Sequence, residues 1–84
     1  TLNVLYVTDA AGHLLDDIRV REFLLSPLDR KVSELMDGEY VNLVATDPQE
    51  TAVEAFRRYD VVALPVTDTT GSLVGIVTVD DVLD

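Results

Sequence analysis

The stretch VVALPVTDTTGSLVGIVTVDDVLD, residues 61–84, decides the fold of this 84-residue chain. Its first part, residues 61–66, is short and apolar throughout, which is typical of a β-strand buried on both faces. A polar turn that contains a glycine separates it from a second apolar run in residues 73–77. Thr78 then has the position of a helix N-cap, with Asp81 at the spacing of a capping box. The pattern predicts a strand, a tight turn, a strand and a helix.

The same pattern occurs once more near the start of the chain. Residues 5–24 align without a gap on residues 64–83. The identical pairs are Leu5 with Leu64, Val7 with Val66, Thr8 with Thr67, Asp9 with Asp68, Gly12 with Gly71, Leu14 with Leu73, Val20 with Val79 and Leu24 with Leu83. The first copy has almost nothing ahead of it, whereas the second follows a long stretch of predicted helix and strand. We therefore expect residues 1–25 to be the C-terminal half of a first unit, and residues 26–84 to be a linker helix followed by a complete second unit.

The middle of the chain predicts the elements of the second unit. Residues 26–38 are expected to form the linker with its short helix, and residues 40–46 a strand. Asp47 is expected to cap the next helix, with Pro48 as its first residue and Glu50 as the returning carboxylate. The apolar side chains of this helix share one face: Ala52, Ala55, Phe56 and Tyr59.

The first copy is less regular, because Asp16 and Asp17 interrupt the apolar run of its second strand. Neighbouring side chains of a strand point to opposite faces, so one of these carboxylates is expected to point inward. A buried carboxylate needs a partner, so we expect either a cation or basic group beside it or an exposed strand. Residues 19–25 predict a helical turn with Phe23 and Leu24 directed inward.

The order LPVTD followed by GSLVGIVTVDD resembles the second half of a CBS (cystathionine β-synthase) domain. The matching positions are Leu64, Pro65, Val66, Asp68, Gly71, Leu73, Gly75, Ile76, Val77, Thr78 and Asp81. The resemblance implies an α+β (mixed α/β) fold, in which a β-α-β-β-α unit has a small mixed sheet with helices on one face. The resemblance implies that two CBS units pair in tandem. This chain looks like an incomplete pair, with one whole unit and half of another, cut from a larger protein. Such a fragment is expected to form a homodimer, side by side or by exchange of segments.

The composition limits the classes of partner. The chain has 16 Asp and Glu against 6 Lys and Arg, and its net charge is −10. This charge argues against binding of nucleic acid or of anionic membranes, and it favours cations or a basic protein as partner. No apolar run approaches the ~20 residues of a membrane helix, so no direct membrane insertion by this segment is expected. The absence of cysteine excludes disulfides and thiolate metal sites.

Catalysis is not expected. The single histidine, His13, falls in the turn between two strands, and no nucleophile or general base accompanies it. No phosphate-binding loop and no histidine pair for zinc are present. The sequence therefore indicates a protein that is not an enzyme.

Binding of ATP or another adenine nucleotide is one candidate function. The CBS resemblance implies that Thr78 and Asp81 bind the ribose hydroxyls, with Ala63 and Pro65 beside the adenine. A carboxylate can accept two hydroxyl hydrogen bonds, and a helix N-terminus attracts phosphate. The first copy departs from this pattern at three positions: Tyr6, Arg19 and Glu22. The alternative is that Thr78 and Asp81 only cap the helix.

Magnesium binding is the other candidate. The opening LNVLYVTDAAGHL and the closing GIVTVDDVLD resemble the CBS region of MgtE-type magnesium transporters. That resemblance implies a homodimeric cytosolic domain, on the cytoplasmic face of the cell membrane, whose acidic faces are bridged by Mg²⁺ and hold the channel shut. Mg²⁺ keeps much of its water and needs one or two carboxylates per site. The candidate ligands are Asp16, Asp17, Asp80, Asp81 and Asp84. Asp9 and Asp68 are expected to form turns instead.

These observations favour a regulatory cytosolic CBS-pair fragment of a magnesium transporter, which senses intracellular Mg²⁺ and has the rest of the parent transporter as its partner. Two alternatives remain open. The first is an adenine-nucleotide-sensing module of another protein, which competes for Asp81. The second is a purely structural dimerisation module.

Overall fold

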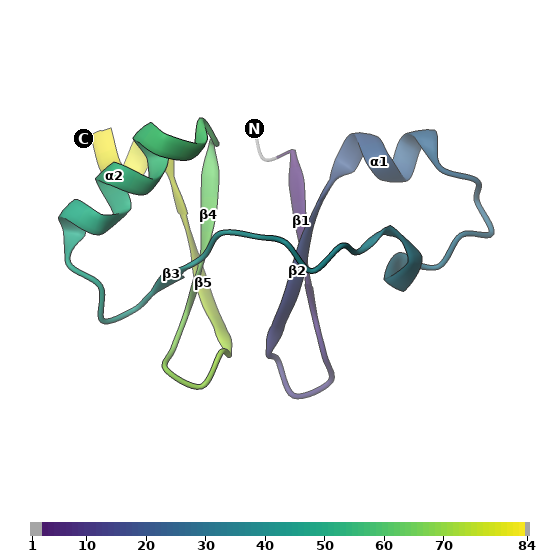
Figure 1. The fold of residues 1–84 in the computed structure, drawn as a ribbon, viewed down its shortest axis with the longest axis horizontal. Coiled ribbons are helices and arrows are strands. Elements are labelled where there is room, and N and C mark those ends of the chain that lie inside the picture. The colour runs from purple at the N-terminus through teal and green to yellow at the C-terminus, as the bar shows by residue number, and fades with distance from the viewer. Residues whose placement is uncertain (1–2, 84) are drawn as a thin grey trace.

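The computed structural model describes residues 3–83 and shows a mixed α/β fold (Figure 1), which confirms the predicted class. The elements in chain order are β1 (Val4–Thr8), β2 (Leu14–Arg19), α1 (Val20–Leu25), the 3₁₀ helix η1 (Val32–Leu35), β3 (Leu43–Val44), α2 (Gln49–Tyr59), β4 (Ala63–Thr67), β5 (Leu73–Thr78) and α3 (Val79–Leu83). The linker, residues 26–42, connects the first three elements to the rest and contains η1.

The strands form two sheets with matching hairpins. β1 and β2 are antiparallel, and Leu5 pairs with Ile18. In the second sheet the order is β3-β4-β5, with β3 parallel and β5 antiparallel to β4. Leu64 pairs with Val77 there, and these are the residues that align with Leu5 and Ile18 in the repeat. Each hairpin also has its register shift at the same place, after Val7 and Val66. The two copies of the sequence repeat therefore form hairpins with the same strand register.

The two hairpins are joined at their turns. The N–H of Leu14 donates to the carbonyl of Gly71 at 2.9 Å, and the N–H of Leu73 donates to the carbonyl of Gly12 at 2.9 Å. His13 and Ser72 form an isolated antiparallel bridge between them. Figure 1 shows the two turns on the same side of the molecule.

The predicted turn roles of Asp9 and Asp68 are confirmed. Asp9 Oδ1 accepts the N–H groups of Ala11 and His13, each at 2.9 Å. Asp68 Oδ1 accepts those of Thr70 at 2.9 Å and Ser72 at 3.0 Å. The glycine of each turn has a positive φ, +88° and +90°, which a side chain would disfavour.

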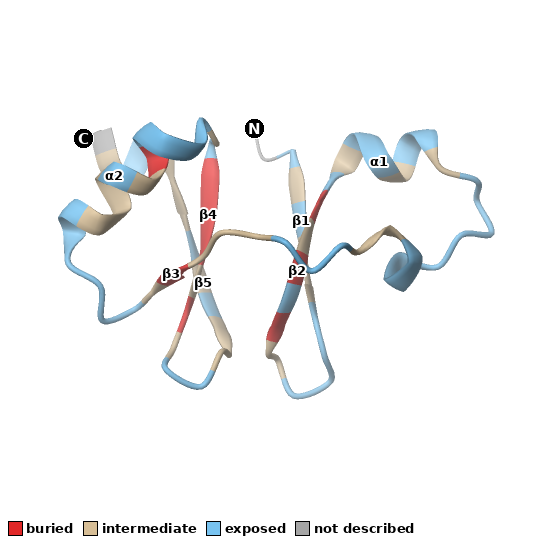
Figure 2. Ribbon diagram, in the orientation of Figure 1, coloured by how far each residue is buried: buried red, intermediate tan, exposed pale blue. Residues whose placement is uncertain are grey.

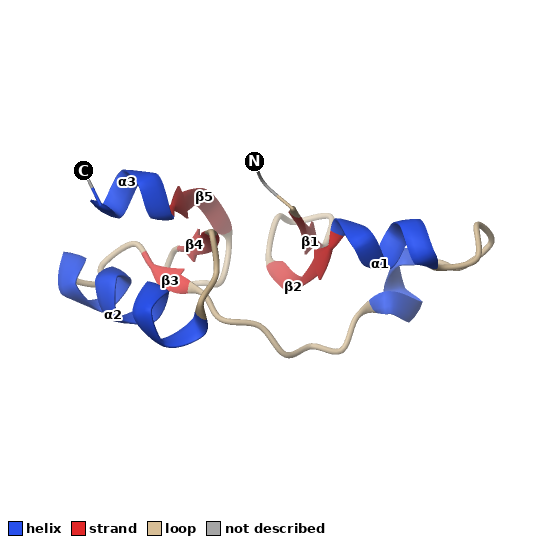
Figure 3. Cartoon of the chain, turned by 90° about the horizontal axis from the view of Figure 1, so that it is seen from above, coloured by secondary structure: helices blue, strands red, loops and turns tan. Residues whose placement is uncertain are grey.

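The core lies between the β3-β4-β5 sheet and its helices. Leu43, Phe56 and Leu64 are buried together, and Ala52 and Ala55 of α2 pack against them. Figure 3 shows α2 and α3 on one side of this sheet and the β1–β2 hairpin on the other. The predicted inner face of α2 is confirmed except for Tyr59, whose exposed fraction is 42%.

Two predictions for the second unit are wrong in detail. Asp47 does not cap α2, because its carboxylate accepts the N–H of Val44 at 2.8 Å and closes a turn there. The helix begins at Gln49, and Pro48 precedes it without a side-chain bond. The strand expected over residues 40–46 is limited to Leu43–Val44, because this same turn follows it directly.

The first unit and the start of the linker leave apolar side chains exposed. Leu24, Leu25 and Leu28 have exposed fractions of 78%, 76% and 103%, so the inward direction predicted for Leu24 is wrong, while Phe23 is half-buried. In the second unit α2 packs against the matching helix α3. The described part of the chain has no such helix against α1, and Figure 2 shows α1 and the following segment mostly exposed.

Candidate functional site

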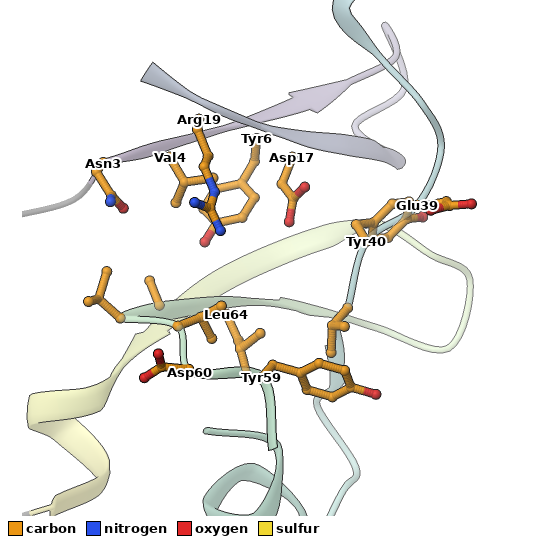
Figure 4. Close-up of a pocket in the computed structure, with 14 residues that line it drawn as sticks. Asn3, Val4, Tyr6, Asp17, Arg19, Glu39, Tyr40, Tyr59, Asp60 and Leu64 are labelled. Atoms are coloured by element: carbon orange, nitrogen blue, oxygen red, sulfur yellow. The ribbon is translucent and has the colours of Figure 1, made fainter. Parts of the chain in front are cut away.

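A cavity of about 320 Å³ lies between the β1–β2 hairpin and the second unit. Three segments form its wall: the facing side of β1 and β2, residues 39–41 of the linker, and residues 59–64 between α2 and β4. Figure 4 shows Tyr6, Asp17 and Arg19 extending from the hairpin towards Leu64 across this space. The alternation along β2 places Asp17 and Arg19 on the cavity side and Asp16 on the other.

The hydroxyl of Tyr6 is buried in this region without a hydrogen-bond partner. Burial raises the pKa of this hydroxyl, and the charge of Asp17 raises it further. An O–H group that is withdrawn from water and unpaired costs free energy, which a bound acceptor would recover. Tyr6 is therefore a group by which the cavity can hold a polar ligand.

Asp17 contributes a half-buried carboxylate to the cavity lining. Burial raises the pKa of Asp17, and the charges of Asp16 and Asp37 raise it further, while Arg19 opposes them. Arg19 supplies a cation on the same wall. The cavity thus presents a hydroxyl, a carboxylate and a guanidinium, a set that can bind a molecule carrying both hydrogen-bond donors and a negative charge.

Asp16 is the inward carboxylate that the sequence predicts, with an exposed fraction of 0%. Its partners differ from the expected cation or basic group. Oδ1 accepts the N–H of Asp17 at 2.8 Å, and Oδ2 accepts those of Asp37 at 2.8 Å and Gly38 at 3.0 Å. Hydrogen bonds from fixed N–H groups stabilise the charged form of a buried carboxylate. The structure therefore gives Asp16 an internal role.

Thr78 and Asp81 cap α3. Thr78 Oγ1 donates to Asp81 Oδ2 at 2.9 Å, the N–H of Thr78 donates to the same oxygen at 3.1 Å, and the N–H of Asp81 donates back to Oγ1 at 3.4 Å. These bonds lower the pKa of Asp81. Among the four predicted nucleotide residues, Ala63 lines the cavity, whereas Thr78, Asp81 and Pro65 do not.

The predicted metal residues are not brought together within the chain. Asp80 and Asp81 are exposed on α3, and Asp17 is half-buried at the cavity. Asp84 lies outside the described residues. Over residues 3–83, no group of three or more His, Asp or Glu side chains lies close enough to hold a metal ion. In the same residues no helix is long and apolar enough to cross a membrane.

Sequence reasoning missed Tyr6 and Arg19 as site residues. The sequence pattern gives neither a binding role, because they occupy the positions of the proline and threonine of the second copy. The cavity nevertheless lies against the first copy, where those two side chains face the second unit. A signal was present, since a tyrosine at a strand position otherwise occupied by a buried proline introduces a hydroxyl that needs a partner.

Comparison with known proteins gives a consistent result. Residues 32–84 match the CBS domain family. Over its whole length the chain is 34% identical to the magnesium transporter MgtE of Enterococcus faecalis and 38% identical to that of Thermus thermophilus. It spans 18% and 19% of the length of these two relatives.

Structural comparison indicates the same relatives. All of the chain superposes, with a TM-score of 0.94 and 38% identity, on 34% of a crystal structure of the cytosolic domain of the Mg²⁺ channel MgtE in complex with ATP. The resemblance to the CBS region of MgtE-type transporters is confirmed. The chain belongs to the CBS domain family.

Proposed function

We propose that this chain is part of the cytosolic regulatory region of a magnesium transporter, where it senses Mg²⁺ and controls ion transport without catalysing a reaction. The observation that carries this proposal is the similarity to magnesium transporters over the whole chain. The net charge of −10 supports it, because such a surface attracts divalent cations.

The proposed ion sites lie at contacts with other chains or domains. Mg²⁺ needs one or two carboxylates and keeps several waters, so Asp80, Asp81 and Asp84 can each contribute to a site completed from a neighbouring surface. Asp17 can do so at the cavity. Asp16 takes no direct part, because three N–H groups already bind its oxygens. When the ion leaves, the facing carboxylates repel one another and the contact opens.

A homodimer is the arrangement that we propose for these contacts. The exposed side chains of Leu24, Leu25 and Leu28 support an assembly in which another chain or the parent transporter covers them. A second copy, side by side or with exchanged segments, would also double the acidic faces. The cytoplasmic face of the membrane is the location that this function requires.

Adenine-nucleotide binding is the second candidate, and the cavity is the observation that favours it. The structural relative was crystallised with ATP. In this chain the cavity lining includes Arg19, which can bind a phosphate. Tyr6 and Asp17 can bind hydroxyl or amino groups, and Ala63 can pack against the base. Ribose binding by Thr78 and Asp81 remains a proposal that requires the cap of α3 to open.

Thermal unfolding of the chain separates the candidates. A ligand that binds only the folded state raises the unfolding midpoint, and the added stability grows with the logarithm of its concentration over Kd. Stabilisation by millimolar Mg²⁺, beyond that of NaCl at equal ionic strength, supports the first candidate. Stabilisation by ATP without Mg²⁺ supports the second. A response to neither leaves the chain a structural dimerisation module.

A further inference from the structure

The buried carboxylate of Asp16 ties the linker to β2. Asp37 and Gly38 lie more than twenty positions away in sequence, yet both donate their N–H groups to Asp16 Oδ2, at 2.8 Å and 3.0 Å. The ion pairs among the described residues are His13 with Asp9 and Arg30 with Glu34, so no cation there neutralises Asp16. The hydrogen-bond partners of its carboxylate are therefore backbone N–H groups.

The linker is shaped for this contact. Gly38 has a φ of +73°, and Asp37 Oδ1 accepts the N–H of Glu39 at 2.9 Å. This turn directs two successive N–H groups at one oxygen, an arrangement that favours an anion. Two residues further on, the hydroxyl of Tyr40 donates to the carbonyl of Leu14 at 3.2 Å, which is a second tie to the same strand.

The tied segment continues directly into the cavity wall. Residues 39–41 line the cavity immediately after Asp37 and Gly38. Asp17, the neighbour of Asp16 on the opposite face of β2, lines it too. The position of the linker relative to β2 therefore sets the shape of the cavity on this side.

The repeat shows that the tie is not a general property of the fold. Gly75 is the residue of β5 that aligns with Asp16. It has no side chain, and a Cβ added there would have nothing within 4 Å. The matching strand thus forms in the second unit without a carboxylate, so the role of Asp16 concerns the linker and not the strand.

We propose that Asp16 is a positioning residue, a latch that holds residues 37–41 against β2 and keeps the cavity in its binding shape. The latch itself rests on the contacts of Asp16 with the linker and needs no ligand. Its consequence for a ligand rests on the proposed nucleotide site. When the latch is released, the linker wall samples other positions, and a ligand then binds only the fraction of molecules with the wall in place.

Amide hydrogen exchange tests the latch without any ligand. In D16A, which removes the acceptor, exchange at Asp37 and Gly38 is expected to accelerate by about tenfold or more, while amides of the central strand β4 keep their protection. D29N is the matched control, because it removes the same charge from an exposed linker position and should leave both amides unchanged. Unchanged exchange at Asp37 and Gly38 in D16A would overturn the latch, and so would equal acceleration throughout the chain.

A measurement on the unaltered chain covers the case in which D16A fails to fold. A through-hydrogen-bond NMR coupling is expected between the amide nitrogen of Gly38 and the carboxyl carbon of Asp16, and its absence contradicts the latch.

With ATP as the probe, a linker wall that is in place only a tenth of the time weakens binding about tenfold in D16A and leaves D29N unaffected. Equal ATP affinity in both variants overturns the positioning role. Failure of ATP to bind the unaltered chain overturns the nucleotide proposal, and the exchange result still decides the latch.

Discussion

Thr78 and Asp81 cap each other at the start of α3, with Thr78 Oγ1 donating to Asp81 Oδ2 at 2.9 Å and the N–H of Asp81 returning to Oγ1 at 3.4 Å. The same two residues are the predicted ribose ligands, and Asp81 is also a predicted metal ligand. Thr78 Oγ1 and Asp81 Oδ2 already have partners inside the chain. A ligand at this position must therefore compete with the cap.

The cap predicts a loss of stability in T78A even when no ligand is present. Removing an N-cap hydroxyl costs about 1 kcal/mol, which lowers the unfolding midpoint of a domain of this size by about 4–8 °C. Differential scanning calorimetry in plain buffer measures this. T69A is the control, because Thr69 is an exposed threonine of the neighbouring turn. Equal midpoints for T78A and T69A would contradict a structural role for the cap.

This cap was predictable from sequence, and so were the turns at Asp9 and Asp68, because the partners lie within four residues. The partner of Asp16 was not predictable. Alternation along β2 indicates that one carboxylate points inward, but the N–H groups that meet it come from the linker, far away in sequence. Only the fold brings them together.

The turn carboxylates predict a loss of stability in acid. Bonds from Thr70 and Ser72 lower the pKa of Asp68, and bonds from His13 and Ala11 lower that of Asp9. A carboxylate whose pKa is lower in the folded state stabilises it above the ordinary carboxyl pKa. This contribution is lost as the pH falls through the lowered value.

D68N tests this dependence. The amide oxygen still accepts an N–H from the turn but does not titrate, so the decline in the unfolding midpoint of D68N in acid should be shallower than that of the unaltered chain. Midpoints measured across the acid range give the answer. Parallel curves for the two proteins would show that Asp68 does not contribute to acid unfolding.

Asp17 predicts the opposite dependence of stability on pH. Its pKa is raised by burial and by the charges of Asp16 and Asp37, so the folded state loses stability as the pH rises from the ordinary carboxyl pKa to the raised value. D17N should therefore be more stable than the unaltered chain at neutral pH, and the gain should vanish in acid. D29N controls for the general relief of negative charge. The prediction fails if D29N gains as much as D17N.

Tyr6 and Tyr40 predict opposite effects of the same substitution. The hydroxyl of Tyr6 is buried without a partner, so Y6F should gain about 1 kcal/mol of stability. The hydroxyl of Tyr40 donates to the carbonyl of Leu14, so Y40F should lose about 1 kcal/mol. Urea unfolding of both variants measures the pair. Under the nucleotide proposal, Y6F also binds ATP less tightly despite its greater stability.

The remaining errors of sequence reasoning have specific physical causes. The helical turn expected over residues 19–25 directs Leu24 inward, but an apolar residue is buried only where another element covers it. Asp47 has the spacing of an N-cap, and its carboxylate instead meets the N–H of Val44 in the preceding turn. The cavity was missed because it depends on how the two hairpins face each other, which no local pattern encodes.

The central claim is that carboxylates of this chain bind Mg²⁺ at defined sites, beyond the general attraction of a net charge of −10. The most direct test compares the Mg²⁺-dependent rise in the unfolding midpoint of the unaltered chain with that of the D80N/D84N double variant, at constant ionic strength. We expect a clear rise for the unaltered chain and the loss of most of it in the variant. An equal rise in both proteins, or a rise that NaCl reproduces fully, would show that Asp80 and Asp84 do not form a defined Mg²⁺ site.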